Sequence, residues 1–323
     1  MNLLFTNIGR RTYMVEYVLQ LKEQGYPIEL FLSDSTEDTA AFFVDDSVEN
    51  FILPQLSRGD DVFISALLDE CLKRNIDIII PLSDRELMAL ANVKNEFLKH
   101  GIRVVVSNSD VVEISLNKKH YVEIGDKLKF NTPKIYSNIN DIKDLLTDGM
   151  FIRKKIIGSG SVDMAIIKNY DDLRGFSEGT DILQEFISGH EYGVDILNDF
   201  DGKFIHCVAK LKIDMRAGET DKSRVIENKR ISDLAENISG VLKHVGNMDI
   251  DIIEDAHGKL WVIDLNPRFG GGYPATHMSG GNYLKLILDM HLGKEIVRPK
   301  RIESLTMMKG ISVYIANKIS NEG

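Results

Sequence analysis

The sequence predicts an α/β amino-terminal part built on a parallel sheet, followed by a longer α+β part with mostly antiparallel strands. In residues 1–112, strongly apolar runs of strand length alternate with helical patterns. This is typical of parallel sheets that are covered on both faces. After that point the pattern changes to pairs of strands joined by short turns. Neither part contains a sequence repeat or a low-complexity segment.

The composition favours a cytoplasmic protein of two domains that acts on small molecules. Its 323 residues exceed the length of one typical domain. The net charge of −10 argues against a nucleic-acid or anionic-membrane partner, because both require a basic surface. Cys71 and Cys207 lack metal-binding spacing, and the first residues lack the pattern of a signal peptide. We therefore expect reduced thiols and a cytoplasmic location.

The first part is expected to alternate strands with helices. The expected strands cover residues 2–7, 28–34, 76–84 and 102–108, and the expected helices cover 10–25, 62–75 and 85–101. Gly25 is expected to cap the first helix. Polar residues follow the strand ends, where α/β sheets collect functional groups. The first of these loops has one glycine, so the dinucleotide-binding fingerprint is absent.

The second part is expected to be α+β. A helix and a loop lead to a hairpin with strands at 150–156 and 164–169. Strand-like stretches follow at 181–199 and 202–214, with a turn at Asp201-Gly202. The remaining expected elements are a helix at 229–246 and strands at 248–255, 259–266 and 308–317.

A glycine-rich loop forms the tip of the expected hairpin, directly after Lys154 and Lys155. It consists of Gly158, Ser159, Gly160 and Ser161. Glycines let backbone N–H groups approach an anion, and serines add hydroxyl donors. The lysines precede the glycines, so this is not a Walker A loop. The alternative is a solvent-exposed hairpin tip with basic flanks.

The strand at 259–266 ends with an acid, an amide and an arginine at alternate positions. Asp264, Asn266 and Arg268 should project to one face, because side chains alternate along a strand. Asp249 and Asp251 lie on the preceding strand. These oxygens favour a Mg²⁺ site completed by phosphate oxygens, with Arg268 facing the transferred phosphate. The alternative is a surface strand that ends in a polar turn. The glycine run 270–272 allows close packing.

The order of these features resembles the ATP-grasp superfamily, in the style of the synthetase units of carbamoyl-phosphate synthase and related carboxylate–amine ligases. The resemblance implies a pre-ATP-grasp parallel α/β domain over 1–112 and an ATP-grasp domain over 113–297. The latter divides into a small lobe at about 113–188 and a large lobe at about 189–297. A C-terminal tail strand would cover 298–323.

The resemblance also implies roles for individual residues. Lys118, Lys154 and the loop at 158–161 correspond to groups that bind the triphosphate. Gln184, Glu185 and Ile187 would flank adenine, and Glu191 would hold the ribose. Asp251, Asp264 and Asn266 would bind metal, with Arg268 on the phosphate. The sequence departs from the family pattern at Asp264, where glutamate is usual, and at Asn117, where aspartate is common. The choice of Lys154 over Lys155 or Arg153 stays open.

The implied reaction joins a carboxylic acid to an amine. Mg-ATP, or Mn-ATP as the alternative, would phosphorylate the acid and release ADP, and the amine would then displace phosphate. The implied partners are a small carboxylic acid and an amine, amino acids included, and a homodimer is the implied assembly. Alternatives are a carbamoyl-phosphate-synthase-like synthetase unit, a carboxylate kinase, and a non-catalytic nucleotide-binding regulatory protein.

A basic segment is expected to recognise the acid. Lys210, Lys212 and Arg216 have even spacing and could share one strand face. The residues after Arg216 suggest a mobile loop over the site, and we expect Arg216 to pair with the substrate carboxylate. A solvated charged loop is the alternative. Arg10, Arg11 and Glu86, at strand ends of the first domain, are weaker candidates for the substrate side.

Overall fold

The structure is a computed structural model that describes residues 1–120, 122, 125, 130–147, 149–157, 164–300 and 302–315. The chain divides into two compact units. The first comprises Met1–Ser109, His291–Lys294 and the described residues from Lys309 onward. The second comprises Asp110–Met290 and Glu295–Met308.

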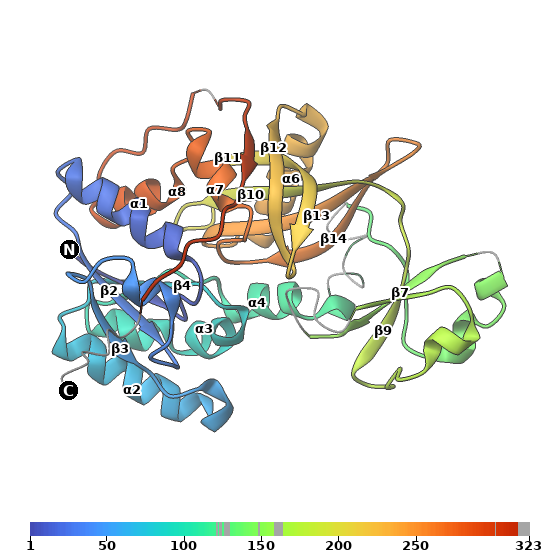
Figure 1. The fold of residues 1–323 in the computed structure, drawn as a ribbon, viewed down its shortest axis with the longest axis horizontal. Helices are drawn as coiled ribbons and strands as arrows, with labels where there is room; N and C mark the ends of the chain where they lie inside the picture. The colour runs from blue at the N-terminus through green and yellow to red at the C-terminus, as the bar shows by residue number, and fades with distance from the viewer. Residues whose placement is uncertain are drawn as a thin grey trace, which may run out of the picture. The chain divides into compact units, whose positions relative to one another are not determined.

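The first unit is built on a five-stranded parallel sheet with the order β3-β2-β1-β4-β5 (Figure 1). Its strands are β1 (Asn2–Thr6), β2 (Glu29–Asp34), β3 (Glu49–Ile52), β4 (Ile78–Pro81) and β5 (Arg103–Val104). Helix α1 (Thr12–Glu23) lies on one face, and α2 (Asp60–Lys73) and α3 (Asp84–Lys99) lie on the other (Figure 1). The predicted parallel sheet, covered on both faces, is confirmed.

The sequence prediction missed the edge strand β3. It has four residues, and only Phe51 among them is buried, so no apolar run marks it. The central strands differ because helices cover both of their faces. Ile78, Ile79 and Ile80 of β4 are each at most 1% exposed. Apolar runs therefore reveal the centre of this sheet but not its edge.

The helix ends of the first unit follow local rules. Gly25 has a φ of +87°, and its N–H donates to the Lys22 carbonyl at 2.9 Å, which confirms the predicted cap. Ser83 and Glu86 form a capping box at the start of α3. The fully buried Glu86 carboxylate also accepts from Asn7 Nδ2 at 2.7 Å. Glu86 therefore links the ends of β1 and β4.

The second unit contains two antiparallel sheets, which confirms the predicted α+β part. One has the order β14-β13-β10-β11-β12-β15, and the other has the order β6-β9-β7-β8. The first sheet comprises β10 (Gly189–Asn198), β11 (Phe204–Arg216), β12 (Glu219–Ile226), β13 (Gly246–Asp255), β14 (Leu260–Asn266) and β15 (Thr306–Met308). The second comprises β6 (Ile135–Tyr136), β7 (Phe151–Lys155), β8 (Ala165–Ile167) and β9 (Asp181–Glu185). Antiparallel pairing of β7 with β8 confirms the predicted hairpin.

Four helices that follow the parallel sheet in the chain accompany these sheets. They are α4 (Ser109–Leu116), α6 (Lys229–Leu242), α7 (Tyr273–Met278) and α8 (Tyr283–His291). Short 3-10 helices cover Ala40–Phe43, Leu56–Arg58, Ile139–Ile142, Leu145–Thr147 and Tyr170–Leu173. Across the residues that the structure describes, none of the helices combines the length and apolar character needed to cross a membrane.

The six-stranded sheet has one apolar face and one charged face. Val194, Ile196 and Ile250 point to the apolar face, where they pack in one core with Ile231 and Ile238 of α6. The alternate residues of the same strands carry the charged groups of the candidate site. One sheet therefore forms the core of the unit with one face and supplies polar side chains with the other.

The final strand differs from the prediction. A strand was expected at 308–317, but β15 ends at Met308, and residues 309–315 form no strand. Ile311, Val313 and Ile315 alternate as in a strand and are 80%, 88% and 70% exposed. Their β-branched side chains suggested a strand, but β propensity depends on packing against neighbours, which these side chains lack.

Candidate active site

Residues from distant parts of the chain line one cavity of about 510 Å³ in the second unit. Six of the residues expected from the sequence lie in its wall: Lys118, Lys154, Ile187, Glu191, Asp251 and Asp264. They come from both sheets, because Lys154 lies on β7 whereas Asp251 and Asp264 lie on β13 and β14. The structure thus brings together side chains that are separated by up to 146 positions, from Lys118 to Asp264.

Lys154 is the basic residue of its segment that points into the interior. It is 7% exposed, and its Nζ donates to Gln184 Oε1 at 2.8 Å. Burial lowers the pKa of Lys154, although the nearby Asp264 carboxylate opposes this effect. Lys155 also lines the cavity but pairs with Asp181 at 2.6 Å, and Arg153 donates to a backbone carbonyl. An anionic ligand beside Lys154 would favour its charged form and so counteract the effect of burial on its pKa.

The segment expected to bind adenine lies partly in the wall. Ile187 lines the cavity together with Phe186, Ser188 and Gly189. A Cβ at Gly189 would overlap the carbonyl of Glu254 on β13, so only glycine allows this close approach. Gln184 contacts Lys154, and the Glu185 N–H donates to the carbonyl of Lys134 at 2.9 Å. Neither Gln184 nor Glu185 is among the wall residues.

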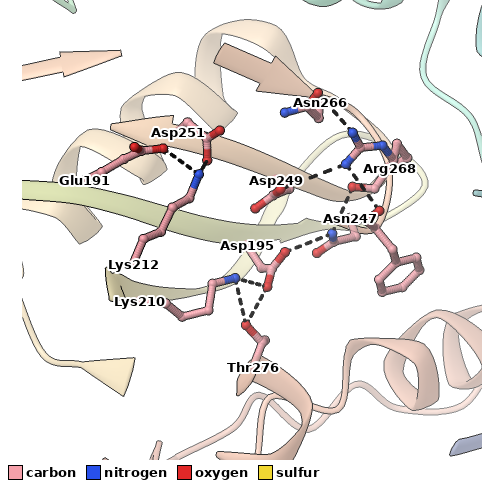
Figure 2. Close-up of polar contacts among 11 residues, drawn as sticks. Glu191, Asp195, Lys210, Lys212, Asn247, Asp249, Asp251, Asn266, Arg268 and Thr276 are labelled. Carbon is pink, nitrogen blue, oxygen red and sulfur yellow. Dashed lines mark hydrogen bonds and ion pairs between the residues drawn. The ribbon is translucent and has the colours of Figure 1, made fainter. Parts of the chain in front are cut away.

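The acid, amide and arginine at the end of β14 face the acids of β13. Asp264 pairs across the strands with Asp251, and Asn266 pairs with Asp249. Arg268 Nη2 donates to Asn266 Oδ1 at 3.1 Å, and Arg268 Nη1 lies 3.9 Å from Asp249 Oδ2 (Figure 2). Two carboxylates and an amide oxygen on neighbouring strands are the hard donors that Mg²⁺ prefers. The donor set therefore fits the metal that the sequence implied.

Lysines already neutralise these acids. Lys212 Nζ lies 2.6 Å from Asp251 Oδ1 and 2.7 Å from Glu191 Oε1 (Figure 2). Lys118 Nζ lies 3.7 Å from Asp264 Oδ1. Burial acts to lower the pKa of Lys212, but the charges of Asp251 and Glu191 outweigh it and raise this pKa above the usual lysine value. The cavity group is Lys118, Lys154, Glu191, Lys212, Asp251 and Asp264.

A second set of charges, the inner group, lies on the same face and is almost completely buried. It comprises Asp195, Lys210, Asn247 and Thr276. Lys210 forms a short ion pair with Asp195 and lies 3.2 Å from Thr276 Oγ1 (Figure 2). Asn247 Nδ2 donates to Asp195 Oδ1 at 3.3 Å. Sequence reasoning offered Lys210 for the substrate acid and missed its burial, because its partners lie 15 and 66 positions away.

Side chains of neighbouring strands pack closely against the glycine run after Arg268, and Gly270 is the position where only glycine fits. A Cβ at Gly270 would overlap the Asp249 carboxylate. A Cβ at Gly271 would lie 3.1 Å from Glu219 Cβ, and one at Gly272 would lie 3.4 Å from Lys210 Cε. The predicted close packing at this run is confirmed, and the packed group is Asp249. Burial and the charge of Asp195 raise the pKa of this carboxyl.

The predicted shared face holds for Lys210 and Lys212 but is wrong for Arg216. The β11–β12 ladder shifts register between Lys212 and Asp214 and again between Asp214 and Met215. As a result Met215, not Arg216, lines the cavity. Ala217 and Gly218 have positive φ angles and form a tight hairpin turn where a mobile loop was expected. Arg216 pairs with Asp221, and its role toward the acid stays a prediction.

Part of the predicted site cannot be placed. The phosphate-loop residues Gly158, Ser159, Gly160 and Ser161 lie outside the described residues. Among the described residues, no group of three or more His, Cys, Asp and Glu side chains has the arrangement of a metal site. Glu86, a weaker candidate for the substrate side, is fully buried in the first unit.

Comparisons with known proteins identify both parts of the chain. Residues 115–272 match the ATP-grasp domain, and residues 3–105 match the PylC-like N-terminal domain. A curated relative is the carbamoyl phosphate synthase large chain of Thermoanaerobacter sp. (strain X514), 22% identical over 228 residues. The match covers 64% of this chain, which spans about a fifth (21%) of the relative's length.

Solved structures share the fold. The biotin carboxylase domain dimer of Hydrogenobacter thermophilus 2-oxoglutarate carboxylase, solved with MgADP, ADP and bicarbonate, has a TM-score of 0.72 and 14% identity, covering 93% of this chain and 72% of that chain. N5-carboxyaminoimidazole ribonucleotide synthetase from Thermotoga maritima has a TM-score of 0.68 and 17% identity. The match covers 94% of this chain and 79% of that chain. L-amino acid ligase from Bacillus licheniformis has a TM-score of 0.66 and 16% identity. The match covers 90% of this chain and 74% of that chain.

The two domain matches, the strand order of both sheets and the cavity between lysines and hard oxygen donors agree with one another. The chain carries an ATP-grasp domain preceded by a PylC-like N-terminal domain, and members of the ATP-grasp family are ATP-dependent ligases.

Proposed function

We propose that this protein is an ATP-dependent ligase that joins a carboxylic acid to an amine through an acyl phosphate. One observation carries the proposal: lysines and hard oxygen donors from distant segments meet at one cavity, with Lys118 and Lys154 facing Asp251 and Asp264. This arrangement suits a triphosphate with its divalent ion, because the lysines can bind phosphate oxygens while the acids bind the metal. Mg²⁺ would neutralise charge on the phosphates when it is bound.

The reaction would proceed in two balanced steps. A carboxylate oxygen attacks the γ-phosphorus of ATP, the bond to the β-phosphate oxygen breaks, and ADP leaves. The amine nitrogen then attacks the acyl carbon, phosphate leaves, and the nitrogen loses a proton. Arg268, held 3.1 Å from Asn266 beside the metal donors, is placed to balance charge on the transferred phosphoryl group.

The comparisons support the class of reaction and suggest the kind of substrate. One similar structure is an L-amino acid ligase, and another is a ribonucleotide synthetase. We propose an amino acid as one of the two substrates. Glu191 would hold the ribose, and the segment around Ile187 would bind adenine. A homodimer and a cytoplasmic location are part of the same proposal.

A second candidate is a carbamoyl-phosphate-synthase-like synthetase unit or a carboxylate kinase. The similarity to the carbamoyl phosphate synthase large chain favours it. A carboxylate kinase would release a phosphorylated carboxylate without needing an amine, whereas a carbamoyl-phosphate-synthase-like unit would also consume ammonia and release carbamoyl phosphate. A nucleotide-binding regulatory protein would bind ATP and release no ADP.

One experiment separates enzymes that form an acyl phosphate from adenylation and from a regulatory protein, and a parallel sample without hydroxylamine or amines identifies a kinase, because only a kinase then releases a phosphorylated acid. The protein is incubated with Mg-ATP, a pool of carboxylic and amino acids, and hydroxylamine, and the nucleotides and hydroxamates are then resolved by mass spectrometry. ADP together with a hydroxamate is the expected result, because hydroxylamine traps an acyl phosphate. The mass of the hydroxamate names the acid. AMP with pyrophosphate would contradict the proposal, and ATP binding without any ADP would indicate a regulatory protein.

A further inference from the structure

Lys212 occupies the space between two carboxylates that the proposed function needs for its ligands. Its Nζ lies within 2.7 Å of both Asp251 Oδ1 and Glu191 Oε1, and its side chain is 8% exposed (Figure 2). The lysine stem passes over Gly193 of β10, the strand that also carries Glu191, and a Cβ at Gly193 would lie in van der Waals contact with Lys212 Cε, at 3.4 Å. The fold therefore provides a place for this ammonium group.

The charges around the cavity balance before any ligand arrives. Lys118, Lys154 and Lys212 oppose Glu191, Asp251 and Asp264, and the remaining wall lysine, Lys155, is balanced by Asp181. A bare divalent cation entering this group would meet no excess negative charge. It would also have to displace an ammonium group from Asp251, where a contact of 2.6 Å is already made.

Asp264, the other proposed metal-binding acid, forms a longer ion pair than Asp251 does. Lys118 lies 3.7 Å from Asp264, and Asp264 is 22% exposed. A triphosphate would draw Lys118 toward its own oxygens and so free Asp264 for the metal. Lys212 would stay paired with Glu191, so that Asp251 becomes a metal ligand only when the nucleotide brings the metal in.

We propose that Lys212 is a resident counter-ion that closes the Asp251–Glu191 side of the site to divalent cations, so that the metal binds only together with the nucleotide. This inference rests on the proposed function for the identity of the nucleotide. The effect of Lys212 on metal binding can be measured without any acid, amine or turnover. The inference about Lys212 and the proposed ligase function can therefore fail separately.

The test measures Mn²⁺ binding to the nucleotide-free protein, from the loss of the free-ion electron paramagnetic resonance signal. Lys212→Met leaves Asp251 and Glu191 without their cation, and we expect its Mn²⁺ affinity to exceed that of the wild type by about ten-fold or more. Lys212→Arg keeps the charge and should bind as weakly as the wild type. Lys155→Met is the matched control, because it removes a lysine of the same wall that pairs with Asp181.

Each outcome decides the question. Equal Mn²⁺ affinity of wild type and Lys212→Met would overturn the proposal, as would an equal gain in Lys155→Met. Thermal unfolding of each variant shows whether it is folded. If Lys212→Met does not fold, the wild type alone decides: tight Mn²⁺ binding without nucleotide would overturn the proposal, and binding of Mn²⁺ with ADP beyond what the same ADP binds without protein would support it.

Discussion

The inner group and the cavity group place similar ion pairs on one face of one sheet, yet their surroundings differ. Asp195 and Lys210 of the inner group are 0% and 1% exposed. In the cavity group, the side chains of Glu191 and Asp264 are 38% and 22% exposed. A pair enclosed on all sides has no ligand to exchange with, whereas a pair beside a cavity can change partners. The same chemistry therefore supports the fold in one place and function in the other.

Breaking an ion pair should cost much more free energy in the inner group than in the cavity group. Removing one partner of a buried pair leaves an uncompensated charge and typically costs about 3–5 kcal/mol. A longer, partly exposed pair such as Lys118–Asp264 contributes about 0–1 kcal/mol, so a ligand can break it at small cost. Substitutions in the two groups should consequently separate stability from activity.

The largest effect on stability is expected at Lys210. Lys210→Met leaves the buried Asp195 carboxylate without its cation, and the free energy of unfolding should fall by about 3–5 kcal/mol. Urea unfolding measures this change. The control is the double variant Lys210→Met with Asp195→Leu, which removes both charges and should recover much of the loss. A single variant as stable as the wild type would show that the inner group is not structural.

At the cavity, Asp264→Asn should act on activity instead. It removes the charge of an expected metal ligand while keeping the side-chain shape, and ADP formation should fall by about 100-fold or more. The free energy of unfolding should change by less than about 1 kcal/mol, because the pair with Lys118 is partly exposed. Asp214→Asn, which removes an exposed partner of Lys222, is the control and should leave ADP formation unchanged.

Two glycines, Gly270 packed against Asp249 and Gly240 with open space around it, allow the cost of close packing to be measured. Gly270→Ala places a methyl group where the Asp249 carboxylate lies, and overpacking of this kind costs about 1–3 kcal/mol. Gly240→Ala in α6 is the matched control, because no atom lies within 4 Å of its added Cβ. That change should stabilise the helix by about 0.5–1 kcal/mol. Equal denaturation midpoints of the two variants would contradict the account.

A pH-dependent effect on stability is expected at Glu86, a buried carboxyl held by hydrogen bonds in the first unit. Burial raises its pKa to about 7, from 4.5. Since the folded state holds this proton more tightly than the unfolded state, stability should fall as pH rises from about 4.5 to 7. Glu86→Gln should flatten this part of the pH profile, measured by urea unfolding at several pH values. Parallel profiles for the two proteins would exclude this role.

Much of the fold could be predicted from local patterns. The apolar runs of β1, β2 and β4 revealed the parallel sheet, because burial on both faces requires them. The exposed edge strand β3 carried no such pattern. The tail at 309–315 had the β-branched pattern of a strand, but it forms none. The pattern of apolar and β-branched residues indicates which side chains are suited to burial. It indicates strand pairing only where paired strands are also buried, as in β1, β2 and β4.

The candidate site shows the same limit. Alternation predicted that Asp264 and Asn266 face the acids of β13, and the register confirms it. Even spacing also suggested that Lys210, Lys212 and Arg216 share one face, but register shifts in β11 are invisible in the sequence. The partners of Lys210 and Lys212 come from other strands and from α7. Sequence alone therefore could not show which lysines are already neutralised.

The central claim, that this cavity directs chemistry to the γ-phosphate of ATP, can be tested by positional isotope exchange. ATP labelled with ¹⁸O at the β–γ bridge is incubated with the protein, Mg²⁺ and the acid pool without amine, and the label is followed by ³¹P nuclear magnetic resonance. We expect the label to move from the bridge to the non-bridging β-phosphate positions, because reversible acyl phosphate formation lets the β-phosphate of ADP rotate. Exchange at the α–β bridge in a matched sample would instead mean adenylation and would contradict the account.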